Sequence, residues 1–102
     1  ALACSMRGLR AAFAGEAAFR QEIALAAVLI PVAVWAPFSP IERVLLIGSM
    51  LLVLITELLN SAIEKTLDRV SREDHRLTGM AKDMGSAAVL MALLVLALTW
   101  LA

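Results

Sequence analysis

Long uncharged stretches alternate with short charged ones along this chain. Residues 23–41 carry no charged side chain over 19 positions, and residues 84–102 carry none over another 19. Between them lies a third uncharged run of 13 positions, residues 44–56. A helix needs about 20 residues to cross the ~30 Å hydrocarbon core of a bilayer. The pattern therefore predicts three membrane-spanning helices.

Prolines and the required length set the expected limits of these spans. Pro37 and Pro40 flank a short turn, so the first span is expected over 23–36. The second span is expected over 41–66, because its uncharged run alone is too short to cross a bilayer. The third span is expected over 84–102.

The segment before the first span has a different pattern. Residues 5–22 mix apolar and charged positions, which is typical of an amphipathic helix lying on a membrane surface. The expected fold is therefore all-α and integral to the membrane. It consists of this surface helix and three transmembrane helices in a single domain over 1–102, packed as a helical bundle.

Composition agrees with this class of protein. The chain is 62% hydrophobic, whereas soluble domains are roughly 45–50% apolar, and its mean hydropathy is +0.88. The formal net charge is zero, which gives no reason to expect a nucleic-acid partner. The single cysteine, Cys4, cannot form an internal disulfide bond.

Basic residues predict the orientation in the membrane. The connection between the first two spans contains only Arg43. The other basic residues precede the first span or lie between the second and third: Arg7, Arg10, Arg20, Lys65, Arg69, Arg72, Arg76 and Lys82. The positive-inside rule then places the N-terminus and residues 65–83 of this multi-pass protein in the cytoplasm.

A carboxylate stands where the second span should still be inside the membrane. Glu57 directly follows the uncharged run, and Asn60, Glu64 and Asp68 come after it. On a helix the three acidic residues fall within roughly 40° of one another, so they share one face. An ionisable group at membrane depth is costly and points to a functional site.

These residue types permit two kinds of chemistry. Carboxylates clustered at a wet boundary can hold Mg²⁺ together with substrate phosphates. A glutamate at membrane depth can act as a general base toward a lipid hydroxyl. Lys82 and Asp83 precede the third span, where the lysine could meet a phosphate. The alternative is that all these groups pair with basic residues and help the helices associate.

Three sequence blocks resemble one family of membrane enzymes. They are residues 16–22 (EAAFRQE), 57–64 (ELLNSAIE) with Asp68 and Arg69 after it, and 81–89 (AKDMGSAAV). Together they are similar to prokaryotic diacylglycerol kinase, with matching spacing over nearly the whole chain. The resemblance implies a homotrimer in the inner membrane that phosphorylates diacylglycerol with MgATP. It also implies active sites shared between neighbouring subunits.

The resemblance also implies roles for individual residues. Glu57 would be the general base, and Glu16 and Glu64 would bind Mg²⁺. Residues expected at the nucleotide are Cys4, Glu16, Glu64, Glu73, Asp74, His75, Lys82 and Asp83. Residues expected at the lipid substrate are Ser5, Arg10, Phe13, Phe19, Arg20, Gln21, Glu22, Trp35, Glu57 and Ser86. Asn60 and Asp68 would support these groups. Cys4 and Asp74 depart from the family, which has an aromatic residue at each position.

Three other functions are weighed against a diacylglycerol kinase. An undecaprenol kinase would share the fold and differ in its lipid acceptor. A small oligomeric ion or proton pathway would use Glu57 as a relay but would not need Glu16, Lys82 or Asp83. A purely structural subunit would use its polar residues for helix association alone.

Overall fold

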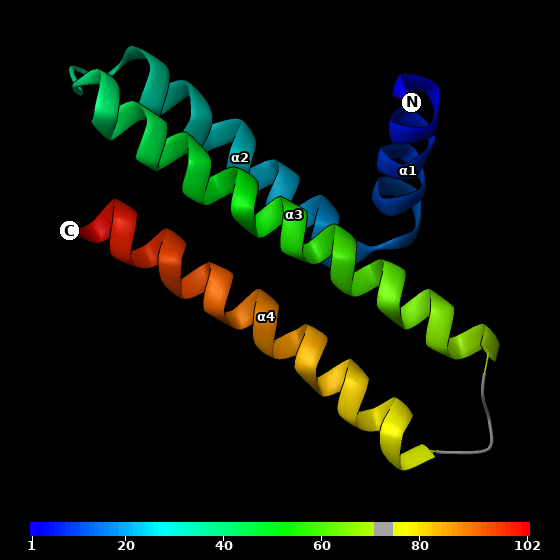
Figure 1. Ribbon diagram of the computed structural model, residues 1–102. Coiled ribbons are helices and arrows are strands. Elements are labelled where there is room, and N and C mark those ends of the chain that lie inside the picture. Colours follow the sequence, from blue (N-terminus) through cyan, green and yellow to red (C-terminus); the bar gives the residue numbers. More distant parts are fainter. Residues whose placement is uncertain (71–74) are drawn as a thin grey trace.

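The computed structural model describes residues 1–70 and 75–102, and every secondary-structure element in these ranges is a helix. Its elements are α1 (Leu2–Gly15), α2 (Ala17–Trp35), α3 (Pro40–Val70) and α4 (His75–Leu101). Figure 1 shows α2, α3 and α4 lying lengthwise beside one another, with α1 projecting away from them near the start of α2. This arrangement confirms the all-α prediction.

Helix α3 is the central helix of the bundle. It packs against both α2 and α4. In its most apolar window 39% of the residues are buried, against 17% for α2 and for α4. The buried core joins the three helices through Ala26 of α2, Met50 and Val53 of α3, and Ala92 and Leu96 of α4. The small alanines on the outer helices allow a close approach to α3.

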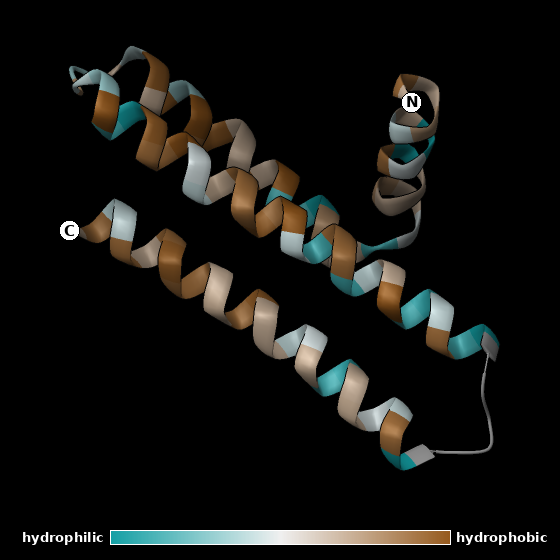
Figure 2. Ribbon diagram, in the orientation of Figure 1, coloured by the Kyte–Doolittle hydropathy of each residue, from teal (hydrophilic) through white to brown (hydrophobic). Residues whose placement is uncertain are grey.

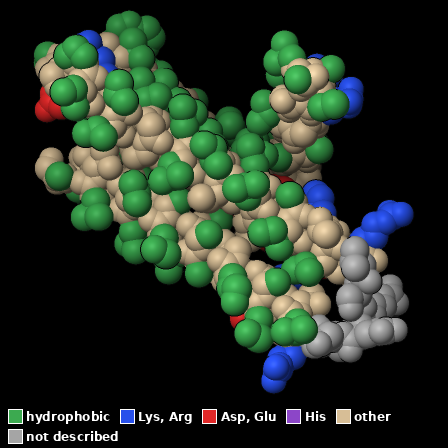
Figure 3. Space-filling model, viewed as in Figure 1, with side chains coloured by type: hydrophobic (Ala, Val, Ile, Leu, Met, Phe, Trp, Pro, Cys, Tyr) green, Lys and Arg blue, Asp and Glu red, His purple; other side chains and the backbone are tan. Residues whose placement is uncertain are grey.

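Three helices are long and apolar enough to cross a membrane: Ala17–Trp35, Pro40–Arg69 and Arg76–Leu101. Hydrophobic residues run along α2, α3 and α4 (Figure 2). Many of them are exposed on the outside of the bundle, including Val28, Leu51 and Leu94. Figure 3 shows lysine and arginine side chains on α1 and toward the two ends of the bundle, with apolar side chains between them. The three predicted spans are thus confirmed by length and composition.

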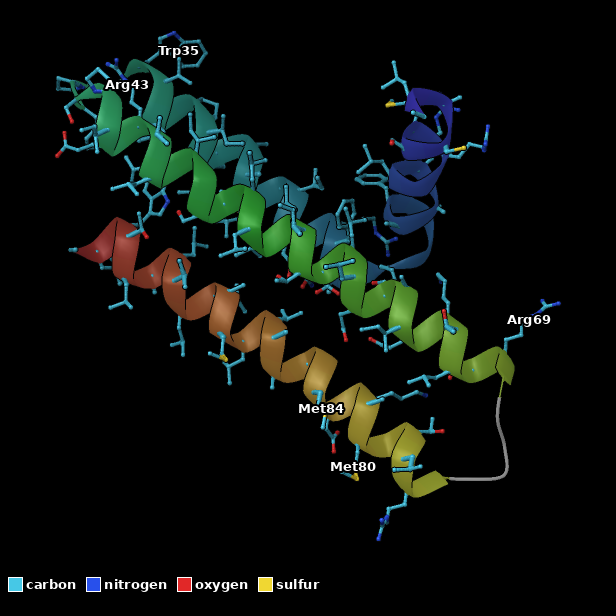
Figure 4. All side chains as sticks on the ribbon, in the orientation of Figure 1. Trp35, Arg43, Arg69, Met80 and Met84 are labelled. Atoms are coloured by element: carbon cyan, nitrogen blue, oxygen red, sulfur yellow. The ribbon has the colours of Figure 1, made fainter. Side chains whose placement is uncertain are left out.

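The turn between α2 and α3 is fixed by a reciprocal cap. The Ser39 backbone N–H donates to Glu42 Oε1 at 2.7 Å, and the Glu42 N–H donates to Ser39 Oγ at 3.2 Å. Pro40, in the first position of α3, needs no hydrogen-bond acceptor there. Figure 4 shows Trp35 and Arg43 at this end of the bundle and Arg69 at the opposite end.

Two helix limits differ from those expected. The helix expected over 5–22 ends at Gly15, and Glu16 is extended, with φ −124° and ψ 111°. Residues 17–22 instead open α2. Arg20 explains the break, because its guanidinium donates to the carbonyls of Phe13 and Ala14 at 2.8 and 3.2 Å. These bonds satisfy carbonyls that a continuous helix would use itself.

The last helix begins well before its expected span at residue 84. Helix α4 starts at His75, so Lys82 and Asp83 lie inside a helix and not at its start. The sequence pattern marked the apolar part of this helix. It missed the polar first turns, because these carry charges that a hydropathy criterion rejects.

Candidate active site

The most deeply placed acidic group is Glu57, near the middle of α3. Its side chain is only 6% exposed, and Ser61 Oγ donates to Glu57 Oε2 over a long 3.5 Å. The Glu22 carboxyl of α2 comes within hydrogen-bonding reach of Glu57, while Glu22 Oε1 is buried and has no donor. Two carboxyl groups, one from α2 and one from α3, are therefore brought together at the contact between these helices.

One turn further along α3, an amide group orients a second carboxylate. Asn60 Nδ2 donates to Glu64 Oε1 at 2.8 Å. The other side of the Asn60 amide lies against Gly85 of α4. The amide therefore sits at the contact between α3 and α4 and fixes one oxygen of Glu64.

A lysine from α4 completes this polar face. Lys82 Nζ binds Asp68 Oδ1 at 2.7 Å, and it also interacts electrostatically with Glu64. The side chains of Lys82 and Asp68 are 40% and 65% exposed, so the pair contributes little to stability. Its effect is to hold the ammonium group near Glu64. Asp83 is the next residue of α4, and its side chain is exposed.

Glu16 occupies the break between α1 and α2. Its backbone N–H donates to the Ala12 carbonyl at 2.9 Å, and its side chain is half-buried. The end of α1 is close to α3 here, because a Cβ atom at Gly15 would lie 3.8 Å from Lys65 Nζ. The residue expected to bind a metal is thus at the junction of α1, α2 and α3.

Two apolar hollows flank α1 and contain several of the residues expected at the lipid. One, of about 330 Å³, lies between α1 and α2 and is lined by Leu9, Arg10, Phe13, Phe19 and Ile23. The other, of about 530 Å³, lies between α1 and α3 and includes Ser5, Ser61 and Lys65. Ser61, which lines the second hollow, is also the residue that contacts the buried Glu57 carboxylate.

The remaining expected residues are more scattered. Gln21 and Ser86 are exposed, as is Cys4, whose sulfur accepts a bond from Arg7. Trp35 is 79% exposed and lies 13 residues beyond Glu22 on α2, roughly 20 Å along the helix axis, so it is remote from this face. Glu73 and Asp74 lie outside the described residues, as does the side chain of His75.

The carboxylate oxygens near this face are of the type that a hard cation binds. Within the described ranges, no three histidine, cysteine, aspartate or glutamate side chains gather closely enough to form a metal site. Mg²⁺ commonly takes one or two carboxylates and completes its shell with water and phosphate oxygens. Glu16 and Glu64 supply oxygens of that kind, and Asn60 restrains one oxygen of Glu64.

Three contributors to this face were not singled out by the sequence analysis. Ser61 follows Glu57 by four residues, a spacing that by itself predicts a side-chain contact on a helix. Lys65 was counted only for its charge. Gly85 is not predictable from the sequence pattern, because its contact with Asn60 depends on the register between α3 and α4.

The fold and this face define a class of protein: a small multi-helix membrane protein with a carboxylate- and lysine-lined site at one end of its bundle. The particular family follows from comparison with known proteins. The family model for prokaryotic diacylglycerol kinase matches residues 3–102. The chain belongs to the prokaryotic diacylglycerol kinase family.

Individual relatives match over nearly the same range. The diacylglycerol kinase of Pseudomonas aeruginosa PAO1 is 59% identical over 96 residues, covering 94% of this chain and 78% of the relative. That of Escherichia coli K12 is 54% identical, covering 94% and 79%. The diacylglycerol kinase of Helicobacter pylori 26695 is 42% identical over 100 residues, covering 98% and 78%. These matches confirm the predicted family.

Proposed function

We propose that this protein is an ATP-dependent diacylglycerol kinase, which transfers the γ-phosphoryl group of ATP to the lipid hydroxyl and forms phosphatidic acid. The relatives carry that name. The observation that carries the proposal is the buried Glu57 carboxylate, which is followed along α3 by Asn60, Glu64 and Asp68. Its neighbour Ser61 lines a hollow beside α1. A lipid acceptor cannot leave the bilayer, so the group that activates it must be on a membrane helix.

The reaction needs one group that accepts a proton and positively charged groups that stabilise the phosphate oxygens. Glu57 accepts the proton of the diacylglycerol hydroxyl while that oxygen attacks the γ-phosphorus. The bond from the γ-phosphorus to the bridging oxygen breaks, and ADP leaves. Lys82 stabilises the negative charge on the phosphate oxygens, with Asp68 holding it in place.

Glu16 and Glu64 are the residues proposed to hold Mg²⁺, which when bound neutralises phosphate charge. Asn60 orients Glu64 through the bond to Oε1. The nucleotide contacts proposed for Cys4, Glu73, Asp74, His75 and Asp83 rest on the resemblance to the family.

The lipid is proposed to lie beside α1. The hollow lined by Arg10, Phe13 and Phe19 is apolar except for its arginine, which suits an acyl chain with a polar group at one end. Ser5 lines the second hollow, which reaches Ser61 beside Glu57. Arg20, Gln21, Glu22 and Ser86 complete the proposed lipid side. Trp35 lies at the far end of α2 and belongs to a lipid contact only through the family resemblance.

We further propose a homotrimer in the bacterial inner membrane, with the N-terminus in the cytoplasm. The exposed apolar side chains of α2 and α4 support association or contact with lipid, because such surfaces are rarely left in water. The basic residues on α1 and near the α3–α4 connection support a cytoplasmic location for that end. In the family, the active sites are shared between subunits.

Phosphoryl transfer in mixed micelles tests the function. The purified protein is incubated with Mg²⁺ and γ-labelled ATP, with either diacylglycerol or undecaprenol as acceptor. We expect labelled phosphatidic acid and little labelled undecaprenyl phosphate. Transfer to undecaprenol alone would reassign the acceptor, and transfer to neither lipid would contradict a lipid kinase and favour an ion pathway or a structural role.

A further inference from the structure

Gly85 differs from the other described glycines in what surrounds it. A Cβ atom at Gly8, Gly48 or Gly79 would meet nothing within 4 Å. At Gly85, a Cβ atom would collide with Asn60 Oδ1 and approach Asn60 Cγ to 3.3 Å. Gly85 is buried within α4, so the space that its missing side chain leaves is filled by the amide of α3.

This position leaves one polar atom of the Asn60 amide without a hydrogen bond. Its Oδ1 atom is buried and has no hydrogen-bond partner, which is unfavourable for a strong acceptor. Its Nδ2 atom, in contrast, binds Glu64 Oε1 at 2.8 Å. The amide is thus held by the bond to Glu64 on one side and by the fit against Gly85 on the other.

We infer that Gly85 is a positioning residue: it provides the space in which Asn60 orients the Glu64 carboxylate. A methyl group at this position would force the Asn60 side chain to rotate, because the colliding atom is the tip of a flexible side chain and not backbone. Rotation moves Nδ2 away from Glu64. The consequence for Mg²⁺ rests on the proposed function, whereas the consequence for the Asn60–Glu64 bond does not.

Gly85→Ala is the test, and Gly79→Ala is its matched control. Both glycines lie within α4, and both substitutions add the same methyl group to the helix, but only the first would meet another side chain. Because both changes raise helix propensity equally, a difference between them reports the contact with Asn60.

The first readout is independent of activity. Asn60 is the one asparagine in the chain, so labelling with side-chain ¹⁵N-asparagine gives the NMR signal of a single NH₂ group in micelles, one pair of cross-peaks. We expect this signal to shift and its hydrogen exchange to accelerate in Gly85→Ala. In Gly79→Ala it should match the parent. An unchanged signal in Gly85→Ala would overturn the inference, even if the proposed function were wrong.

The second readout is the Mg²⁺ dependence of lipid phosphorylation. In Gly85→Ala we expect the half-saturating Mg²⁺ concentration to rise about tenfold, which corresponds to the loss of a hydrogen bond to a charged group. Gly79→Ala should keep the parental value. Parental Mg²⁺ dependence in Gly85→Ala would contradict the positioning role. Absence of transfer in the parent itself would contradict the proposed function, and the NMR measurement would still decide the role of Gly85.

A double variant covers the case in which Gly85→Ala does not fold. Asn60→Ala removes the atoms that the new methyl group would strike. The combined Asn60→Ala and Gly85→Ala protein should therefore fold and have the same Mg²⁺ dependence as Asn60→Ala alone, since the two changes act through one contact. A double variant that misfolds, or that is clearly worse than Asn60→Ala, would overturn the inference.

Discussion

At the scale of single residues, the polar groups that share one face of α3 have different partners. Their common face follows from helical periodicity alone, and the sequence predicts it correctly. The identity of their partners does not follow from helical periodicity. Glu57 faces Glu22 of α2, Asn60 lies against Gly85 of α4, and Asp68 binds Lys82. Each of these contacts depends on how neighbouring helices are aligned, which the sequence of one helix does not encode.

The Lys82–Asp68 pair gives a prediction at this scale. In Asp68→Asn we expect no measurable change in the free energy of unfolding, because both side chains are substantially exposed and solvent screens the pair. The KM for MgATP should rise a few-fold, because Lys82 loses its anchor, while kcat stays near the parental value. Steady-state kinetics and denaturant titration in micelles measure both. A loss in kcat of about 100-fold or more would mean that Asp68 takes part in the reaction itself.

At the scale of elements, the turn before α3 and the apolar lengths of the helices were predictable, and the break after α1 was not. The turn is encoded locally by Ser39, Pro40 and Glu42. The break depends on Arg20, which reaches back over six and seven residues to the end of α1. A pattern of polar and apolar positions does not distinguish this capping role from an exposed charge on a continuous helix.

Arg20→Met tests the cap. Removing two charge-assisted bonds at an exposed helix end should destabilise the last turn of α1 by about 1 kcal/mol and accelerate amide exchange there roughly fivefold. Exchange in the core of α3 and α4 should not change. Hydrogen exchange with mass spectrometry measures this, with Arg7→Met as the control, because Arg7 binds Cys4 within α1. If the amide hydrogens of residues 10–15 exchanged equally slowly in the parent and in Arg20→Met, Arg20 would not be what fixes the break between α1 and α2.

At the scale of the whole molecule, the three spans are the most predictable feature. In a bilayer each spanning helix must satisfy its own backbone hydrogen bonds, so length and apolar composition are nearly sufficient to identify it. The described structure extends 54 Å in its longest dimension, more than the ~30 Å of the hydrocarbon core. The apolar length of α3 does not indicate which of its residues lie beyond the core. The packing of α1 against the start of α2 was likewise beyond the sequence pattern.

One buried carboxylate, Glu57, carries the proposed chemistry, and Glu57→Gln is the most direct test of it. The substitution keeps the size of the side chain and removes its ability to accept a proton. Glu42→Gln is the matched control, because Glu42 lies on the same helix, is exposed, and keeps a capping oxygen after the substitution.

The measurement is the rate of labelled phosphoryl transfer from MgATP to diacylglycerol, with helix content and oligomeric state checked in the same samples. We predict that Glu57→Gln assembles as the parent does and that its kcat falls at least about 100-fold, the usual contribution of a general base. Glu42→Gln should retain the parental rate. A correctly assembled Glu57→Gln protein with a kcat within about tenfold of the parent would contradict the assignment of Glu57 as the base.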